Sequence, residues 1–286
     1  MMKYLKLFRV SQWYKNLVIF IPIIFARRVL DFPSLINVII GFFALCCISS
    51  CNYIINDLVD VKKDRIHSEK RERPIAAGEI KIVEAVILAV ILFGLSFLIS
   101  YKLNPVFILW IFALFLSTQI YSFWLKNTAI IDVFLISFNF LIRTTAGIIA
   151  ANVNTSNWLI LITFLLALFL AIGKRYSELI LLGKNAEKSK PVFKFYSLEI
   201  LNSLENITAG LLLAAYSFYT FLAETSNNIM MGTIPIAVFI IFRYLFLVKT
   251  GSVIARRTEL IVKDKQILSA IIIWCVVSIS IYYFPF

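Results

Sequence analysis

A short polar block, Asn56–Ile80, carries three aspartates that are followed closely by three bases. The aspartates are Asp57, Asp60 and Asp64, and the bases are Lys70, Arg71 and Arg73. Mg²⁺ prefers oxygen ligands and is typically held by one or two carboxylates plus substrate phosphates, while arginine suits bidentate contact with phosphate. The block therefore predicts a site for Mg²⁺ and a phosphorylated substrate. The alternative is a solvated loop whose charges pair with one another.

The spacing of the aspartates is helical. If the helix before the block continues past Ile55, a turn of 100° per residue places Asp60 at about 300° and Asp64 at about 340° from Asp57. Asn56 joins the same side of this helix. Like charges so close repel one another unless a cation neutralises them, so we predict that the three aspartates are catalytic metal ligands and that Asn56 binds substrate.

The composition identifies the kind of protein that must position these residues. The 286-residue chain is 61% hydrophobic and 15% charged, with a mean hydropathy of +0.90, whereas soluble domains average about 45–50% apolar and 25% charged. We therefore expect a polytopic membrane protein whose first apolar segment is retained. The four cysteines lie in apolar runs and are interpreted as small buried residues. The single histidine, His67, is interpreted as an ordinary loop residue.

Apolar stretches approaching twenty residues predict nine membrane-spanning helices. Their expected ranges are 16–32, 35–55, 82–101, 106–123, 130–151, 158–173, 201–222, 233–248 and 267–284. With a cytoplasmic N-terminus, 23 of the 28 Lys and Arg residues fall on the cytoplasmic side, 3 on the outer side and 2 within spans. This asymmetry follows the positive-inside rule. It explains the net charge of +12 without nucleic acid and predicts polar chemistry at the cytoplasmic face.

Further polar positions lie within the apolar segments. Asp132, Asn139 and Arg143 fall within about 40° of one another on the fifth expected span. Intramembrane ionisable groups usually face a bundle interior or a water-filled cavity, so this stripe would extend the site. The alternative for Arg143 is a structural pairing with an acid on another helix.

The segment GKRYSEL, Gly173–Leu179, follows the sixth expected span. Lys174 and Glu178 are spaced as an i,i+4 pair, and Arg175 lies beside them. One interpretation is anchoring at the membrane interface. The other is a second phosphate-binding group opposite the aspartates.

These residues together resemble a known family. Asn56-Asp57 with Asp60 and Asp64, followed by KRERPIAAG (Lys70–Gly78), resembles the first signature of the UbiA superfamily of intramembrane prenyltransferases. Within it, the chain resembles the decaprenyl-phosphate phosphoribosyltransferase branch. The matching segments are SQWYKN (Ser11–Asn16), YSFWLKN (Tyr121–Asn127), LIRTTAG (Leu141–Gly147) and GKRYSEL.

The resemblance implies a single integral-membrane domain over residues 1–286, an all-α bundle of nine transmembrane helices with its active site at the cytoplasmic side of the inner cell membrane. It implies Mg²⁺-dependent transfer of 5-phosphoribose from phosphoribosyl diphosphate to a polyprenyl phosphate, with release of diphosphate. The partners would be these two substrates and the bilayer, with a homo-oligomer as a further option. The lipid phosphate is already an anion, so no strong general base is needed.

The resemblance also implies a set of substrate-binding residues. Lys174 and Arg175 are the candidates for phosphate contacts. The full set is Lys15, Asn16, Asn56, Lys70, Arg71, Arg73, Tyr121, Lys126, Asp132, Asn139, Arg143, Lys174, Arg175 and Glu178.

One departure from the superfamily pattern separates its branches. Aromatic prenyltransferases carry a second aspartate-rich motif after the sixth span, where this chain has GKRYSEL with the single acid Glu178. Fewer acids and more bases favour a substrate with an additional phosphate, such as the 5-phosphate of the sugar. The alternatives are a UbiA-type aromatic prenyltransferase using polyprenyl diphosphate, another activated sugar with the same acceptor, and a transporter.

Overall fold

The computed structural model describes residues 2–66, 70–222 and 228–283, and every regular element in these ranges is a helix. This confirms the all-α expectation. The chain divides into two compact units, Met1–Phe123 with Ile142–Asn154, and Trp124–Leu141 with Thr155–Phe286. Helix α7 (Ile131–Ala151) contributes its first half to the second unit and its second half to the first. His67 lies outside the described residues.

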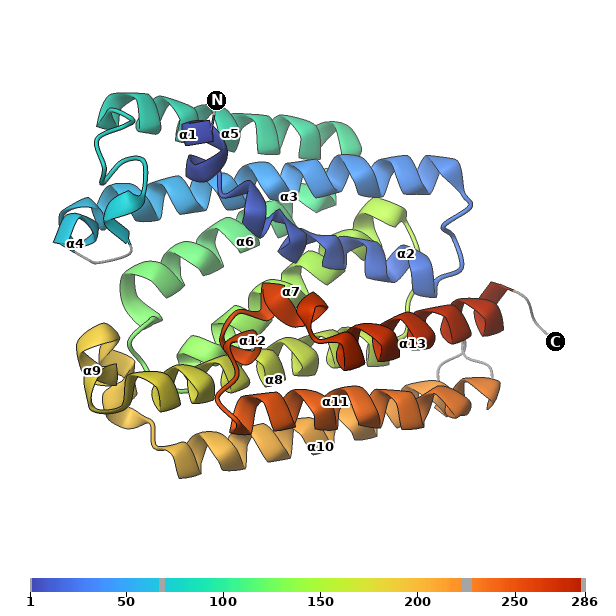
Figure 1. Ribbon diagram of the computed structural model, residues 1–286. Coiled ribbons are helices and arrows are strands. Elements are labelled where there is room, and N and C mark those ends of the chain that lie inside the picture. The colour runs from blue at the N-terminus through green and yellow to red at the C-terminus, as the bar shows by residue number, and fades with distance from the viewer. Residues whose placement is uncertain (1, 67–69, 223–227, 284–286) are drawn as a thin grey trace. The chain divides into compact units, whose positions relative to one another are not determined.

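The first unit is built on two long helices that pack side by side, α3 and α5 (Figure 1). Its elements are α1 (Met2–Leu7), η1 (Val10–Phe20), α2 (Ile21–Phe25), α3 (Phe32–Val59), α4 (Val61–Ile66), η2 (Lys70–Glu72), α5 (Ile82–Leu103) and α6 (Pro105–Ile120). A π-helical turn, η3 (Tyr121–Leu125), follows α6.

Local sequence explains where these helices begin. Asn104 accepts a hydrogen bond from the Val106 amide at 2.8 Å, and Pro105 occupies the first helical position of α6. An asparagine cap satisfies one of the otherwise unpaired amides at a helix start, and proline there loses nothing. Polar bonds also join the helices, because Ser96 of α5 donates to the Ala44 carbonyl of α3 at 2.9 Å.

Glycine allows the closest backbone approach in the first unit. A Cβ at Gly147 would lie 2.2 Å from the carbonyl oxygen of Ile19. Small residues at such positions let membrane helices pack at short range. We predict that Gly147→Ala lowers the free energy of unfolding by about 3 kcal/mol, because a backbone atom cannot move aside like a flexible side chain.

Unfolding of the purified variant in mixed micelles with increasing SDS would measure this loss. The matched control is Gly94→Ala in α5, where the added Cβ meets nothing within 4 Å. This control should be neutral or slightly stabilising, since alanine favours a helix interior. Equal stability of the two variants would contradict the packing argument.

The second unit packs α8 and α10 along each other (Figure 1). Its elements after α7 are α8 (Asn157–Leu182), η4 (Gly183–Asn185), α9 (Ala186–Ser189), η5 (Pro191–Phe195), α10 (Leu198–Leu222), η6 (Asn228–Thr233), α11 (Ile234–Lys249), α12 (Val253–Arg256), η7 (Thr258–Lys263) and α13 (Lys265–Tyr283). One hydrophobic core joins α8, α10, α11 and α13, and a second joins the start of α7 to α8, η5 and α10.

Seven helices in the described ranges are long and apolar enough to cross a membrane, and each coincides with one of the nine expected spans. Of the other two, α10 is a 25-residue helix with a polar first half. The expected limits of the first span, residues 16–32, are wrong, because the helical segment runs from Val10 to Phe25. Most of it has 3₁₀ geometry, whose larger rise gives it a length of about 30 Å.

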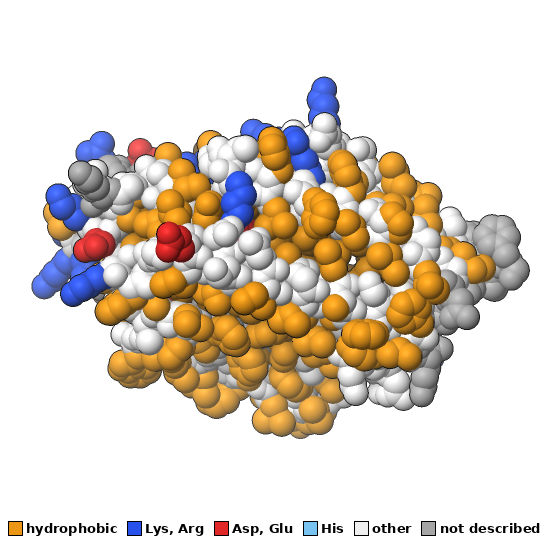
Figure 2. Space-filling model, turned by 90° about the horizontal axis from the view of Figure 1, so that it is seen from below, with side chains coloured by type: hydrophobic (Ala, Val, Ile, Leu, Met, Phe, Trp, Pro, Cys, Tyr) orange, Lys and Arg blue, Asp and Glu red, His pale blue; other side chains and the backbone are white. Residues whose placement is uncertain are grey.

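The apolar character extends to the surface. Figure 2 shows many hydrophobic side chains on the surface, with fewer Lys, Arg, Asp and Glu side chains among them. Soluble monomers rarely expose so much contiguous apolar surface. This distribution is that of an integral membrane protein.

Candidate functional site

An arginine-bridged pair of aspartates forms the most concentrated charge cluster of the first unit. Asp57 and Asp64 are each 2% exposed. The Nη1 atom of Arg73 donates to Asp57 Oδ1 at 3.0 Å and to Asp64 Oδ2 at 2.7 Å. Nη2 of Arg9 donates to the same Asp57 oxygen at 2.5 Å. One positive group thus contacts both buried carboxylates, as a shared cation would.

A break in the helix lies between the two aspartates. The expected continuous helix through Asp64 is wrong, because α3 ends at Val59 and α4 begins at Val61. Asp60 forms the junction with ψ 4°, outside helical geometry, and it lies partly exposed. Asp57 and Asp64 lie seven residues apart, close to two helical turns, and both are buried against Arg73, whereas Asp60 is partly exposed.

The loop after α4 is anchored so that Arg73 returns to α3. Ile75 and Ile80 are each 2% exposed and belong to the core formed with α1, α3 and α5. The Ile80 amide donates to the Pro74 carbonyl at 3.2 Å, and Gly78 takes a φ of +78° that glycine adopts without strain. Two buried side chains therefore fix the loop on both sides of its turn.

Arg9 contacts Asp57 although the two residues lie 48 positions apart in the sequence. Its backbone is in the left-handed region at φ +48°, which is uncommon for a residue with a side chain. Its guanidinium lies 4.6 Å from the centre of the Tyr53 ring, a cation–π contact. Trp13 donates to Ser50 at 3.1 Å and secures the same segment on α3. Strained backbone held by several contacts is frequent at functional sites.

The aspartate pair fits a divalent cation by the chemistry of its donors. Both carboxylates are buried hard oxygen donors, and Mg²⁺ needs only one or two of them when substrate phosphates complete its shell. In the described ranges, no group of three His, Cys, Asp or Glu side chains is arranged to hold a metal ion. The arrangement thus suits a cation shared with a substrate rather than an all-protein cage.

Two further polar contacts lie in the first unit. Gln119 of α6 donates to Asn52 of α3 at 2.5 Å. Nε of Arg143 donates to Asn16 Oδ1 at 2.8 Å, and both residues are buried. The partner of Arg143 in this contact is therefore an amide and not the acid of the structural alternative, and Asn16 is itself one of the expected substrate-binding residues.

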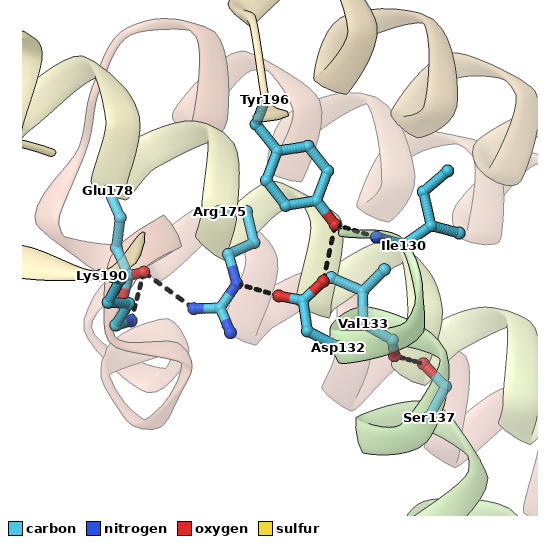
Figure 3. Close-up of polar contacts among 8 residues, drawn as sticks. All are labelled: Ile130, Asp132, Val133, Ser137, Arg175, Glu178, Lys190 and Tyr196. Atoms are coloured by element: carbon cyan, nitrogen blue, oxygen red, sulfur yellow. Dashed lines mark hydrogen bonds and ion pairs between the residues drawn. The ribbon is translucent and has the colours of Figure 1, made fainter. Parts of the chain in front are cut away.

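The second unit contains a chain of alternating acids and bases (Figure 3). Asp132, which is fully buried, accepts from Arg175 Nε at 2.8 Å and from the Tyr196 hydroxyl at 2.6 Å. Arg175 also donates to Glu178 at 3.0 Å, and Lys190 donates to the same Glu178 oxygen at 2.6 Å. The expected i,i+4 pair of Lys174 with Glu178 is thus replaced by an Arg175–Glu178 pair, and Lys174 is exposed.

Burial alters the proton affinities of two groups outside the spans. Burial and the nearby charge of Arg175 lower the pKa of Lys190 to about 8, and the Glu178 carboxylate opposes this only in part. Burial and the hydrogen bond to Asp132 raise the pKa of Tyr196 above its ordinary value. Lys190 therefore loses charge just above neutral pH, while Tyr196 remains a hydrogen-bond donor.

The structure brings together some of the expected site residues and not others. Asp57, Asp64 and Arg73 meet in the first unit, as do Asn16 and Arg143. Asp132, Arg175 and Glu178 meet in the second. Of the other expected residues, Lys70, Arg71 and Lys174 are exposed, and six are partly exposed: Lys15, Asn56, Asp60, Tyr121, Lys126 and Asn139.

Three members of these clusters were missed in the sequence. Arg9, Lys190 and Tyr196 each lie more than ten residues from the acids they contact. The one available signal was the position of Arg9, two residues before the SQWYKN segment. Contacts between distant segments leave no periodic pattern to detect.

Comparison with known proteins gives four related results. A profile of the UbiA prenyltransferase family matches residues 17–179. The chain is 32% identical over 231 residues to a decaprenyl-phosphate phosphoribosyltransferase of Mycolicibacterium smegmatis (79% of this chain, 72% of that protein). It is 31% identical over 292 residues to one of Corynebacterium glutamicum (98% and 87%). A UbiA homolog from Archaeoglobus fulgidus, solved bound to GPP and Mg²⁺, has the same fold, with a TM-score of 0.72 and 19% identity over 96% of this chain and 99% of that one.

Proposed function

Because the chain belongs to the UbiA prenyltransferase family and is a membrane transferase, we propose that it transfers 5-phosphoribose from phosphoribosyl diphosphate to a polyprenyl phosphate of the decaprenyl type. The observation that carries this proposal lies in the second unit. Both acids of its cluster, Asp132 and Glu178, are occupied by basic partners. Together with the exposed Lys174, this cluster holds three bases to two acids, a balance that suits a substrate phosphate better than a second aspartate-rich metal site for a prenyl diphosphate.

In the proposed reaction, an oxygen of the lipid phosphate attacks C1 of the ribose. The bond between C1 and the diphosphate oxygen breaks, and diphosphate leaves with the electron pair. Asp57 and Asp64 would hold Mg²⁺, with Asp60 at their edge; the ion supplies positive charge that stabilises the departing diphosphate. Arg9 and Arg73, which both contact Asp57, would bind the phosphate oxygens of the substrate.

The remaining groups have binding roles in this proposal. Arg175 and Lys190 contact a further phosphate, aided by Lys174. Asn16 and Arg143 orient the sugar through their buried hydrogen bond. A buried carboxylate near C1 would stabilise the positive charge that develops there as the diphosphate leaves.

We propose further that residues 1–286 form one transferase domain with nine spans, a cytoplasmic N-terminus and a cytoplasmic active site in the inner membrane. The length of about 30 Å for Val10–Phe25 supports a ninth crossing, since it equals the thickness of the hydrocarbon core. The 25-residue α10 is long enough for another. The distribution of Lys and Arg supports the orientation.

An assay on the purified protein tests the choice of substrates. One reaction contains labelled phosphoribosyl diphosphate, polyprenyl phosphate and Mg²⁺; the other contains an aromatic acid with polyprenyl diphosphate. We expect lipid product only in the first. Product only in the second reaction would identify an aromatic prenyltransferase instead. Its polyprenyl diphosphate substrate would resemble GPP, the ligand bound to the structural relative.

The lowered pKa of Lys190 predicts a pH dependence. Phosphate monoesters are fully ionised above pH 7, since their second pKa is about 6, whereas Lys190 loses its charge as the pH rises through about 8. Loss of a charge-assisted hydrogen bond should reduce kcat/KM about fivefold between pH 7 and pH 9 for the substrate whose phosphate contacts Lys190.

The matched control for this dependence is Lys190→Arg, because arginine keeps its charge throughout the range. Its kcat/KM should stay flat over the same interval. Each substrate is made limiting in turn, so that the affected phosphate is identified. An unchanged profile for both substrates in the wild type would contradict a phosphate-binding role for Lys190.

A further inference from the structure

An apolar hollow of about 570 Å³ lies on the second unit, on the side of α7 and α8. Its six lining side chains are all hydrophobic: Ile130, Ile131, Phe134, Leu135, Phe138 and Phe164. The rings of Phe134 and Phe164 stand 5.8 Å apart at 64°. From Ile130 to Phe138 the hollow follows about 12 Å of α7. Its shape and lining suit a hydrocarbon chain lying along the helix.

One end of the hollow meets the charged cluster of Figure 3. The amide of Ile130 donates to the Tyr196 hydroxyl at 2.7 Å, and the same hydroxyl donates to Asp132 at 2.6 Å. From Asp132, hydrogen bonds continue through Arg175 to Glu178 and Lys190. The Ile130 end of the hollow is therefore hydrogen-bonded, through Tyr196, to a charged cluster in which Asp132 and Arg175 are buried.

The backbone at this junction is strained and fixed. Ile130 has a φ of +69°, which is costly for a β-branched residue. Its hydrogen bond to Tyr196 helps to hold it there. The junction between apolar hollow and polar cluster is thus a defined position on the unit, as a binding site requires.

The charge at this end suits an anion. Around the cluster, the bases Lys174, Arg175 and Lys190 outnumber the acids Asp132 and Glu178. A ligand that matches both parts has one anionic head and one long apolar tail. A lipid phosphate has this chemistry.

We propose that the hollow binds the first isoprenyl units of the polyprenyl phosphate, with its phosphate at the Arg175–Lys190 end. This rests on the proposed function and specifies where its acceptor lies. The tail then enters the bilayer along α7, and the phosphate reaches the site without leaving the membrane surface.

Photolabelling tests the location without requiring turnover. The full-length protein in phospholipid nanodiscs is irradiated with a polyprenyl phosphate that carries a diazirine in its second isoprenyl unit. We expect the label on peptides containing residues 130–138 or Phe164, with competition by unlabelled polyprenyl phosphate. Leu135→Trp, which fills the hollow, should reduce labelling about tenfold. Phe138→Trp, at a position 44% exposed, serves as a second filling variant that puts folding at less risk.

The matched control is Phe239→Trp on α11 of the same unit, where the side chain is 47% exposed and does not line the hollow. It should label like the wild type. Label outside the hollow overturns the inference, as does equal labelling by a polyprenol without phosphate, which would indicate ordinary lipid contact. Normal turnover together with label on residues outside the hollow would reject the proposed location of the lipid and leave the proposed function intact. No turnover and no competed label anywhere rejects the proposed function with it.

Discussion

Asp57→Asn should reduce turnover by about a thousandfold or more, because it removes one of the two buried carboxylates that would hold Mg²⁺ at the departing diphosphate. Asp57 is the residue on which the first-unit cluster converges, since it accepts hydrogen bonds from both Arg9 and Arg73. Asparagine has nearly the same shape and can still accept from either arginine. The variant should therefore fold and insert normally, as size-exclusion chromatography and SDS unfolding would show.

The control for this prediction changes the same functional group elsewhere in the first unit. Asp31 accepts from Arg28 at 2.7 Å and from Ser34 at 2.9 Å, and Arg28 is exposed. Asp31→Asn should leave the initial rate with labelled phosphoribosyl diphosphate unchanged. Near-normal activity in both Asp57→Asn and Asp60→Asn would reject the assignment of these aspartates to a metal ion.

Arg175→Gln should lower the free energy of unfolding by about 3–5 kcal/mol, since it leaves a fully buried carboxylate without its ionic partner. Asp132 is 0% exposed and Arg175 5% exposed. The Tyr196 hydroxyl would remain as a donor to Asp132 but cannot neutralise it. The loss is measured by SDS unfolding of the purified variant.

A double variant separates the buried charge from simple loss of packing. Asp132→Asn combined with Arg175→Gln should recover part of the stability, because neither uncompensated charge remains. The matched single control is Arg243→Gln, whose 25%-exposed side chain pairs with Asp264 at 2.9 Å. It should cost about 1 kcal/mol. Strict additivity of the two changes at positions 132 and 175 would contradict the ion-pair account.

Much of the helical architecture could be predicted because hydrophobic runs and caps are local signals. The start of α6 at Asn104-Pro105 and seven of the expected spans follow from such signals. The limits of the first span, which is formed by Val10–Phe25, could not be predicted in this way, because a 3₁₀ helix covers the same length with fewer residues. The span expected at residues 201–222 coincides with the helix α10, Leu198–Leu222, although the polar residues of its first half lower its apolar character.

The candidate site was predictable in its residue types and less so in its contacts. The helical register of Asp57 and Asp64 identified the buried pair, yet it could not reveal the break at Asp60 or the contact of both with Arg73. Likewise, the i,i+4 rule paired Glu178 with Lys174, whereas in the structure Glu178 accepts from Lys190 and from Arg175, which also donates to Asp132. Tertiary partners determine which of several local pairings forms.

A dual-label transfer experiment tests the central claim most directly. The purified protein in nanodiscs receives polyprenyl phosphate, Mg²⁺ and phosphoribosyl diphosphate labelled either on the 5-phosphate or on the terminal phosphate of the diphosphate. We predict that the first label enters the lipid, that the second is released as diphosphate in equal amount, and that EDTA stops both. No lipid-bound label, together with prenylation of an aromatic acid by the same preparation, would contradict the assigned reaction.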